Sequence, residues 1–199
     1  VRKNCTLQFP PPSLAAPARA GAARSTPSEP VGADNWRLNV VVSSPGLKGT
    51  QQSLRVHTGA EADLDPYDVA QPPASVRPES VYLKSAFYAN NSGVGMAYVD
   101  DARGPVQSPQ EWHLVIRTNA QNQPVTVSWP SLAQLPRGLV ATLVDPVTGQ
   151  RQYMRTTTSY TFRTGSEVTE RALKIIVQPK PAGALTVTGV TATAVSRGV

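Results

Sequence analysis

The sequence is poor in the residues that build metal and disulfide sites. Its 199 residues include one cysteine and two histidines. A structural zinc ion takes about four cysteine or histidine ligands, more than these residues supply. Cys5 cannot form a disulfide within the chain, although it could pair with a cysteine of a partner. Folds stabilised by zinc or by internal disulfides are therefore excluded.

Long apolar runs are also missing. No run of about 18 apolar residues is present, so the sequence predicts no membrane-spanning segment. The apolar fraction of 40% still suffices for a core in one or two domains. The 19 prolines disfavour a helical bundle, because each interior proline costs a helix about 3 kcal/mol. These counts indicate a β-rich protein.

The net charge of +6 is unevenly distributed. Half of the excess lies in the first 30 residues, and the remaining basic residues are scattered singly through strand-like segments. Because nucleic-acid binding needs a basic patch or run, we expect no nucleic-acid partner. Anionic polysaccharide or lipid headgroups suit the basic N-terminal segment better.

Residues 1–33 form a Pro/Ala-rich block without helical or strand periodicity. Such composition favours extended polyproline II geometry. The block is either a spacer between domains or an arm along a partner, anchored by Leu7, Phe9 and Leu14. Since the chain begins at Val1 without an apolar leader, we expect a processed product or a fragment.

From Trp36 onward, short alternating β-branched segments recur about every 8–12 residues, the spacing of an antiparallel sandwich. We therefore predict an all-β fold, an Ig-like or jelly-roll-like antiparallel β-sandwich of about ten strands over residues 34–178. A hairpin is expected over 153–162, and residues 60–78 read as a long loop. The predicted strands are 36–42, 52–57, 80–83, 95–99, 112–117, 124–129, 139–144, 153–155, 159–162 and 173–177.

Two strands share the pattern Trp-x-Leu-x-(Val/Ile), at Trp36 and at Trp112. Alternation places these large residues on one strand face. The pattern indicates either two core strands of similar composition or a sandwich of two related halves, 34–104 and 110–178.

Residues 179–199 comprise a proline break and then a Thr/apolar alternation over 184–195. They are predicted to be a linker and the first strand of a following domain, or a strand donated to a partner's sheet edge through Leu185 and Val187.

Several short motifs follow one another in a fixed order over residues 35–199. They are Gly59, Asp63, Asp65, Tyr67, Asp68 and Pro72-Pro73; Val81-Tyr82-Leu83; Trp112-His113-Leu114; Val125–Trp129; Leu135–Gly138; Leu143–Pro146 with Gly149; Tyr160-Thr161-Phe162; Arg171, Leu173 and Ile175; and Leu185-Thr186-Val187. This order resembles a β-sandwich module of large secreted or surface proteins of bacteria, which precedes a C-terminal Ig-like domain similar to the flagellar hook-capping type. The resemblance implies export, a non-catalytic scaffold and membership of a longer polypeptide; it implies no ligand.

Asp63, Asp65 and Asp68, with Glu61 nearby, form the one dense acidic group. Carboxylates suit Ca²⁺, which takes six to eight oxygen ligands. The spacing is not that of an EF-hand, and Asp side chains also cap turns. A calcium site and a solvated, turn-capping loop are the two interpretations; no other cofactor is expected.

No catalytic motif is evident. His57 and His113 fall on predicted strands, no Gly-x-Ser-x-Gly occurs, and no glycine-rich phosphate loop precedes a helix. Asp100, Asp101 and Glu111 could supply paired carboxylates, but most β-proteins contain such pairs. We therefore expect a protein that is not an enzyme.

The aromatic residues divide into two groups. Trp36, Trp112 and Trp129 lie within apolar alternation and are predicted core residues. Tyr82, Phe87, Tyr88 and Tyr98 are predicted at the surface, where they could stack on sugars. The expected function is a structural or interaction module at the cell surface, outside the cell or in the periplasm, packing on partner subunits or neighbouring copies. The alternative is a carbohydrate-binding module that recognises cell-surface polysaccharide.

Overall fold

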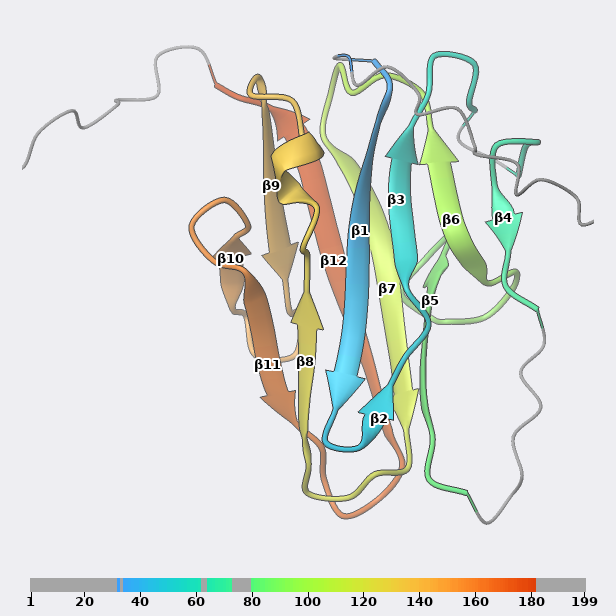
Figure 1. Cartoon of the computed structure of the whole chain (residues 1–199), viewed down its shortest axis with the longest axis vertical. Coiled ribbons are helices and arrows are strands. Elements are labelled where there is room, and N and C mark those ends of the chain that lie inside the picture. The colour runs from blue at the N-terminus through green and yellow to red at the C-terminus, as the bar shows by residue number, and fades with distance from the viewer. Residues whose placement is uncertain (1–31, 33, 62–63, 73–79, 182–199) are drawn as a thin grey trace, which may run out of the picture.

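The computed structural model describes residues 32, 34–61, 64–72 and 80–181. These residues form twelve strands and one short 3-10 helix, with no α-helix among them, so the prediction of an all-β protein is confirmed (Figure 1). The predicted arm at 1–33, apart from Gly32, and the predicted tail beyond Pro181 lie outside the described residues.

The strands follow the predicted alternation closely in the most apolar parts of the chain. The elements are β1 (Trp36–Ser44), β2 (Leu47–Lys48), β3 (Gln52–Val56), β4 (Val69–Ala70), β5 (Leu83–Tyr88), β6 (Tyr98–Arg103), β7 (Gln110–Thr118), β8 (Pro124–Ser128), η1 (Leu132–Gln134), β9 (Leu139–Val144), β10 (Arg151–Tyr153), β11 (Ser159–Arg163) and β12 (Thr169–Pro179).

The strands form one continuous, nearly closed sheet in the order β10-β9-β12-β7-β5-β6-β3-β1-β8-β11 (Figure 1). β2 pairs with β1, and β4 pairs with β6. β1 links two parts of the sheet, because residues 36–40 pair with β3 and residues 41–43 pair with β8. In the sheet order, the strands of residues 34–104 are flanked on both sides by strands of residues 110–178. Both predicted halves contribute residues to one core.

We predicted a purely antiparallel sheet, but one of its strand pairs is parallel. Ser53–Val56 of β3 pairs in parallel with Asp100–Arg103 of β6. A parallel pair needs a long crossover, and residues 57–97, which include β4 and β5, supply it. Alternation within a strand reports its faces and not the direction of its neighbour, so the sequence pattern missed this pair.

The predicted hairpin over 153–162 is wrong. β10 pairs with β9, and β11 pairs with β8, so the two strands end opposite sides of the sheet order. Trp129 holds the segment that connects the two strands, since its Nε1 donates to the carbonyls of Met154 (3.0 Å) and Thr157 (2.7 Å). Two other predicted strands are displaced: 80–83 becomes β5 and 95–99 becomes β6.

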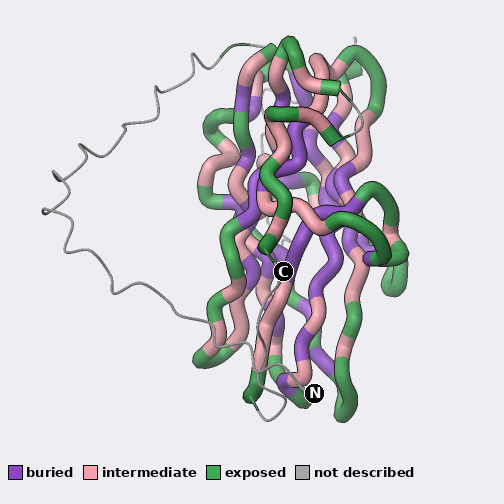
Figure 2. The backbone as a smooth tube through the Cα atoms, turned by 90° about the vertical axis from the view of Figure 1, so that its right-hand side faces the viewer, coloured by how far each residue is buried: buried purple, intermediate pink, exposed green. Residues whose placement is uncertain are grey.

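One apolar core fills the space inside the sheet, and buried residues alternate with more exposed ones along the strands (Figure 2). Trp36, Trp112 and Trp129 are all buried in it, as predicted. The two Trp-x-Leu-x-(Val/Ile) strands, β1 and β7, both contribute to this core. Burying an aromatic or branched side chain stabilises the fold by about 1.5–3 kcal/mol, which makes the shared core the main source of stability.

A buried side-chain amide joins β3 to β5. Gln52 is fully buried; its Nε2 donates to the Ser85 carbonyl (2.7 Å), and the Ser85 hydroxyl donates to its Oε1 (2.8 Å). Tyr98 of β6 pairs with β4 and β5, whereas Asp100 pairs with β4 and β3. β3 and β5 therefore share the edge of β6 opposite β4, and Gln52 bonds across the junction between them.

We predict that Gln52→Ala destabilises the protein by about 2 kcal/mol, because the Ser85 carbonyl is left buried without its donor. Urea unfolding followed by tryptophan fluorescence measures the change. Gln51→Ala is the matched control, since Gln51 is exposed and next in sequence. Equal stability of the two variants would contradict this role for Gln52.

A buried carboxylate fixes the β9–β10 turn to β11 and β12. Asp145 has a fully buried side chain; Tyr160 donates to its Oδ2 (2.5 Å), as does Arg171 Nη2 (2.6 Å). Burial alone would raise the pKa of Asp145, but the hydrogen bonds from Tyr160 and Arg171 hold that pKa below its ordinary value. The folded state therefore favours the charged carboxylate.

We predict that Asp145→Asn lowers stability near neutral pH by about 3 kcal/mol, because Arg171 loses its buried partner. Since the folded-state pKa lies below the unfolded value of about 3.9, the stabilisation by Asp145 is complete above that pH and is lost as the pH falls through the lower folded-state pKa. Unfolding measured from neutral pH to below pH 4 should show a shallower acid decline in the variant. Asp34→Asn, at an exposed aspartate, should retain the wild-type profile.

Candidate functional site

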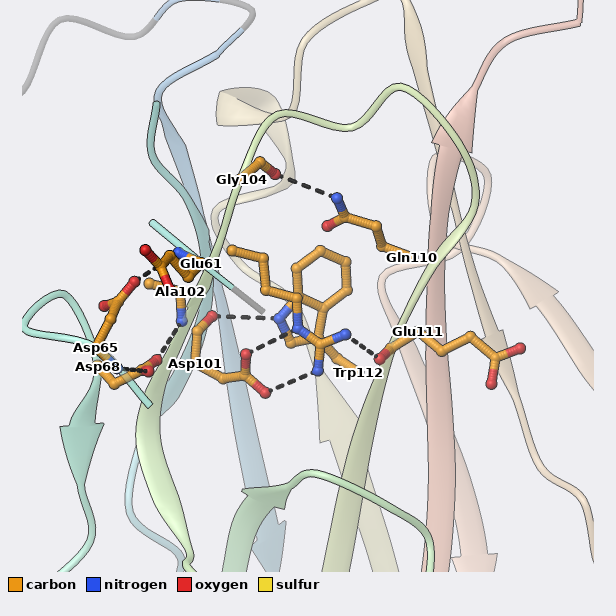
Figure 3. A network of polar contacts seen from close by, with 10 residues as sticks. Glu61, Asp65, Asp68, Asp101, Ala102, Gly104, Gln110, Glu111 and Trp112 are labelled. Carbon is orange, nitrogen blue, oxygen red and sulfur yellow. Dashed lines mark hydrogen bonds and ion pairs between the residues drawn. The ribbon is translucent and has the colours of Figure 1, made fainter. Parts of the chain in front are cut away.

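The acidic loop uses its carboxylates to hold its own backbone (Figure 3). Asp65 accepts hydrogen bonds from the amides of Glu61 and Tyr67 (both 2.6 Å). Asp68 accepts from the amides of Asp65 (3.0 Å) and Ala102 (2.8 Å). The described part of the loop is therefore the turn-capping arrangement that was one of the two interpretations.

The calcium interpretation stays a prediction. Asp63 lies outside the described residues, and within these no group of three or more His, Cys, Asp or Glu side chains is placed to hold a metal ion. The role of Asp68 is structural: by accepting from the Ala102 amide, it occupies the edge of β6 beyond β4. Burial raises its pKa, against the opposing effect of its two backbone donors.

The carboxylates of β6 are engaged in ion pairs. Asp101 binds Arg103 through Nε (3.0 Å) and Nη2 (3.1 Å), and Arg103 lies over the Trp112 ring at 4.6 Å and donates to the Glu111 carbonyl. Asp100 accepts from Arg37 and Ser53. These contacts fasten β6 to β7 and β1, and they give the carboxylates structural partners.

The two histidines lie apart. His57 stacks on Tyr67 with ring centroids 4.0 Å apart. His113 Nδ1 lies 2.6 Å from Asn91 Oδ1, and burial together with the nearby Lys174 lowers its pKa.

The predicted row of surface aromatics is wrong for two of its four members. Phe87 is fully buried in the core, and Tyr88 is only 8% exposed. β5 turns Phe87 inward, whereas Tyr88 faces outward beneath Arg117, which donates to its hydroxyl (3.1 Å). Tyr82 and Tyr98 are partly buried, and Tyr98 packs against the core. The structure therefore offers no exposed aromatic platform from these residues.

The predicted partner anchors Leu7, Phe9, Leu14, Leu185 and Val187 all lie outside the described residues. Their roles stay predictions.

The outer face of β5 and β7 carries a groove that the sequence analysis did not identify. Its volume is about 440 Å³. One wall of the groove is formed by the end of β4 and the residues that follow it, 70–72, and the other by residues 95–97, which lead into β6. Its lining residues are Ala70, Gln71, Pro72, Lys84, Ser85, Ala86, Tyr88, Gly95, Met96, Ala97, Val115 and Arg117.

The floor of this groove is a row of small apolar side chains across neighbouring strands. Ala86 of β5 lies opposite Val115 of β7, which lies opposite Ala172 of β12. Ala86, Val115 and Tyr88 form a second buried apolar cluster, separate from the core, against which Ala97 and Ala172 pack. Apolar burial on the outer face of a sheet indicates that other groups cover it.

A parallel row of charges lies beside the apolar row. Lys84 is opposite Arg117, and Arg117 is opposite Glu170. Arg117 Nε donates to Glu170 Oε2 (2.6 Å), and this bond raises the arginine pKa. Arg117 Nη2 also donates to the Gly93 carbonyl (2.8 Å). Arg117 therefore holds the β5–β6 loop over the sheet and forms one wall of the groove.

Exposed apolar side chains are frequent in the segments that supply the groove lining. Most large apolar side chains that the described residues expose fall between residues 64 and 96, next to the groove-lining segments in sequence. They are Leu64 (56% exposed), Val69 (49%), Val81 (58%), Val94 (73%) and Met96 (49%). Of these, Met96 lines the groove itself, and an exposed apolar side chain at a hollow is typical of a binding surface.

Comparisons with family models, with curated protein sequences and with solved structures found no match. In the described part of the chain, no helix has the length and apolar character needed to cross a membrane. The geometry of the groove therefore carries the functional argument.

We predict that Gly93→Ala detaches the β5–β6 loop. Gly93 has a φ of +61°, and an added Cβ would lie 2.6 Å from Arg117 Nη2 and 3.1 Å from Val115 Cγ1. Limited proteolysis should show faster cleavage within residues 89–97. Gly46→Ala controls for backbone strain, which costs about 1–2 kcal/mol, because Gly46 has a φ of +72° in open space. Unchanged cleavage in Gly93→Ala would show that the bond from Arg117 to the Gly93 carbonyl does not hold the loop in place.

Proposed function

We propose that the chain is a non-catalytic interaction module that holds a segment of a partner protein in the groove over β5 and β7. In this proposal the nearly closed sheet is a β-sandwich that serves as a rigid scaffold. The resemblance to modules of bacterial secreted and surface proteins supports export and an assembly role at the cell surface.

One observation carries the proposal: the groove combines an apolar floor, a loop fixed in place as its wall and an exposed apolar side chain, Met96, in its lining. Binding surfaces are pre-formed hollows lined mainly by apolar groups with a few polar ones. A wall that Arg117 and Gly93 already fix needs little ordering when a partner arrives, which lowers the entropic cost of association.

The carbohydrate-binding alternative is less well supported. Sugar stacking needs an open aromatic face, whereas Phe87 and Tyr88 are buried. The tyrosine that lines the groove, Tyr88, is covered by Arg117.

We predict that a photo-crosslinking amino acid at position 96 captures a partner protein in cells that produce the chain. Met96 lines the groove and is 49% exposed. Ultraviolet light should yield a discrete adduct that mass spectrometry resolves into this chain and one other polypeptide.

The matched control places the same amino acid at position 147. Val147 is 69% exposed and lies in the β9–β10 turn, outside the groove. Adducts of equal yield from both positions, or none from position 96, would contradict the proposal.

A further inference from the structure

We infer that the occupant of the groove is an extended peptide segment that presents an apolar side chain to the floor and a carboxylate to Lys84. This inference rests on the proposed function and specifies the chemistry of its partner. Three features of the groove lead to it: its size, its charge and one unsatisfied acceptor.

The size of the groove favours a segment over a folded surface. A volume of about 440 Å³ falls within the range of pockets that enclose small ligands, so it accommodates a few side chains. Ala86 and Val115 leave space above the sheet because their side chains are short, and Met96 and Pro72 extend the apolar lining on the walls. An aliphatic side chain of a peptide fits this environment.

The charge of the groove favours an anion. Lys84 and Arg117 lie directly opposite each other, and like charges in this position destabilise a sheet. Glu170 compensates Arg117. No carboxylate of the described residues pairs with Lys84, whose Nζ lies 5.4 Å from the centroid of the Tyr82 ring. A carboxylate on the occupant would supply the missing counter-charge.

An unsatisfied acceptor favours a peptide backbone. Gln71 lines the groove, and its Oε1 is buried without a hydrogen-bond partner in the described structure. A buried acceptor left unpaired costs about 1–3 kcal/mol. An extended peptide carries an N–H at each residue other than proline, and a rotation of the Gln71 amide toward the groove would let one of them donate to its Oε1.

The same charges argue against the N-terminal arm of this chain as the occupant. Its first 30 residues carry Arg2, Lys3, Arg19 and Arg24 against Glu29 alone. A basic segment would be repelled by Lys84, so the arm lacks the required chemistry.

The test is a selection of random peptides displayed on phage against the purified full chain. We predict that the wild-type protein enriches an aliphatic residue near an Asp or Glu, and that Lys84→Glu replaces this acidic preference with Lys or Arg. Lys48→Glu makes the same charge change at an exposed position on β2, outside the groove, and should retain the acidic motif. Circular dichroism of both variants verifies that they are folded.

A second measurement needs no protein variant. In the enriched peptide, replacing the acidic residue by its amide should weaken binding to the wild-type chain about tenfold, the loss expected for a hydrogen bond to a charged group. Equal affinity of the two peptides, or an acidic motif that survives Lys84→Glu, would overturn the inference. If the phage selection yields no motif but position 96 still crosslinks to a partner, the peptide inference is overturned and the proposed function stands.

Discussion

The junction at β6 is the constraint on which the rest of the structure depends. β3 and β5 both meet the same edge of β6, one in parallel and the other at a single antiparallel pair, Phe87 with Tyr98. Backbone ladders cannot close such a junction alone, and the buried amide of Gln52 bonds to Ser85 across it. Leaving these groups unpaired inside the protein would cost more than their bonds contribute. One backbone pair and the Gln52 side chain therefore join the β12–β7–β5 part of the sheet to the β3–β1–β8 part.

The groove is a consequence of this junction. β7 runs along one edge of β5, but β6 pairs with the other edge at one position, so most of that edge has no strand beside it. The loop that returns from β5 to β6 covers part of the outer face, and Arg117 holds it there through the Gly93 carbonyl. β4 and the Asp68 carboxylate occupy the far edge of β6, which blocks further strand addition at that side. The site is thus built from strands and their fixed connections.

The sequence predicts the parts of the fold that depend on local alternation. β1, β7, β9 and β12 lie close to their predicted positions, because each strand repeats large apolar residues that only one face can bury. Pairing partners are non-local, which is why the 153–162 hairpin was wrong and the parallel β3–β6 pair was missed. The groove could not be predicted from the sequence for a similar reason. Lys84, Ala86 and Tyr88 occupy every second position of β5, as Val115 and Arg117 do in β7, but only the register brings the two sets together.

The row of charges formed by Lys84, Arg117 and Glu170 couples binding in the groove to the position of the β5–β6 loop. Arg117 bonds to Glu170, Tyr88 and Gly93 at once, whereas Lys84 opposite it lies over the Tyr82 ring and pairs with no carboxylate of the described residues. The repulsion between the two cations acts on the same arginine that holds the loop. An anionic occupant beside Lys84 would weaken that repulsion and thereby strengthen the hold of Arg117 on the β5–β6 loop. Since a ligand that binds only the folded state stabilises it, partner binding and closure of the groove wall would reinforce each other through this one row of side chains.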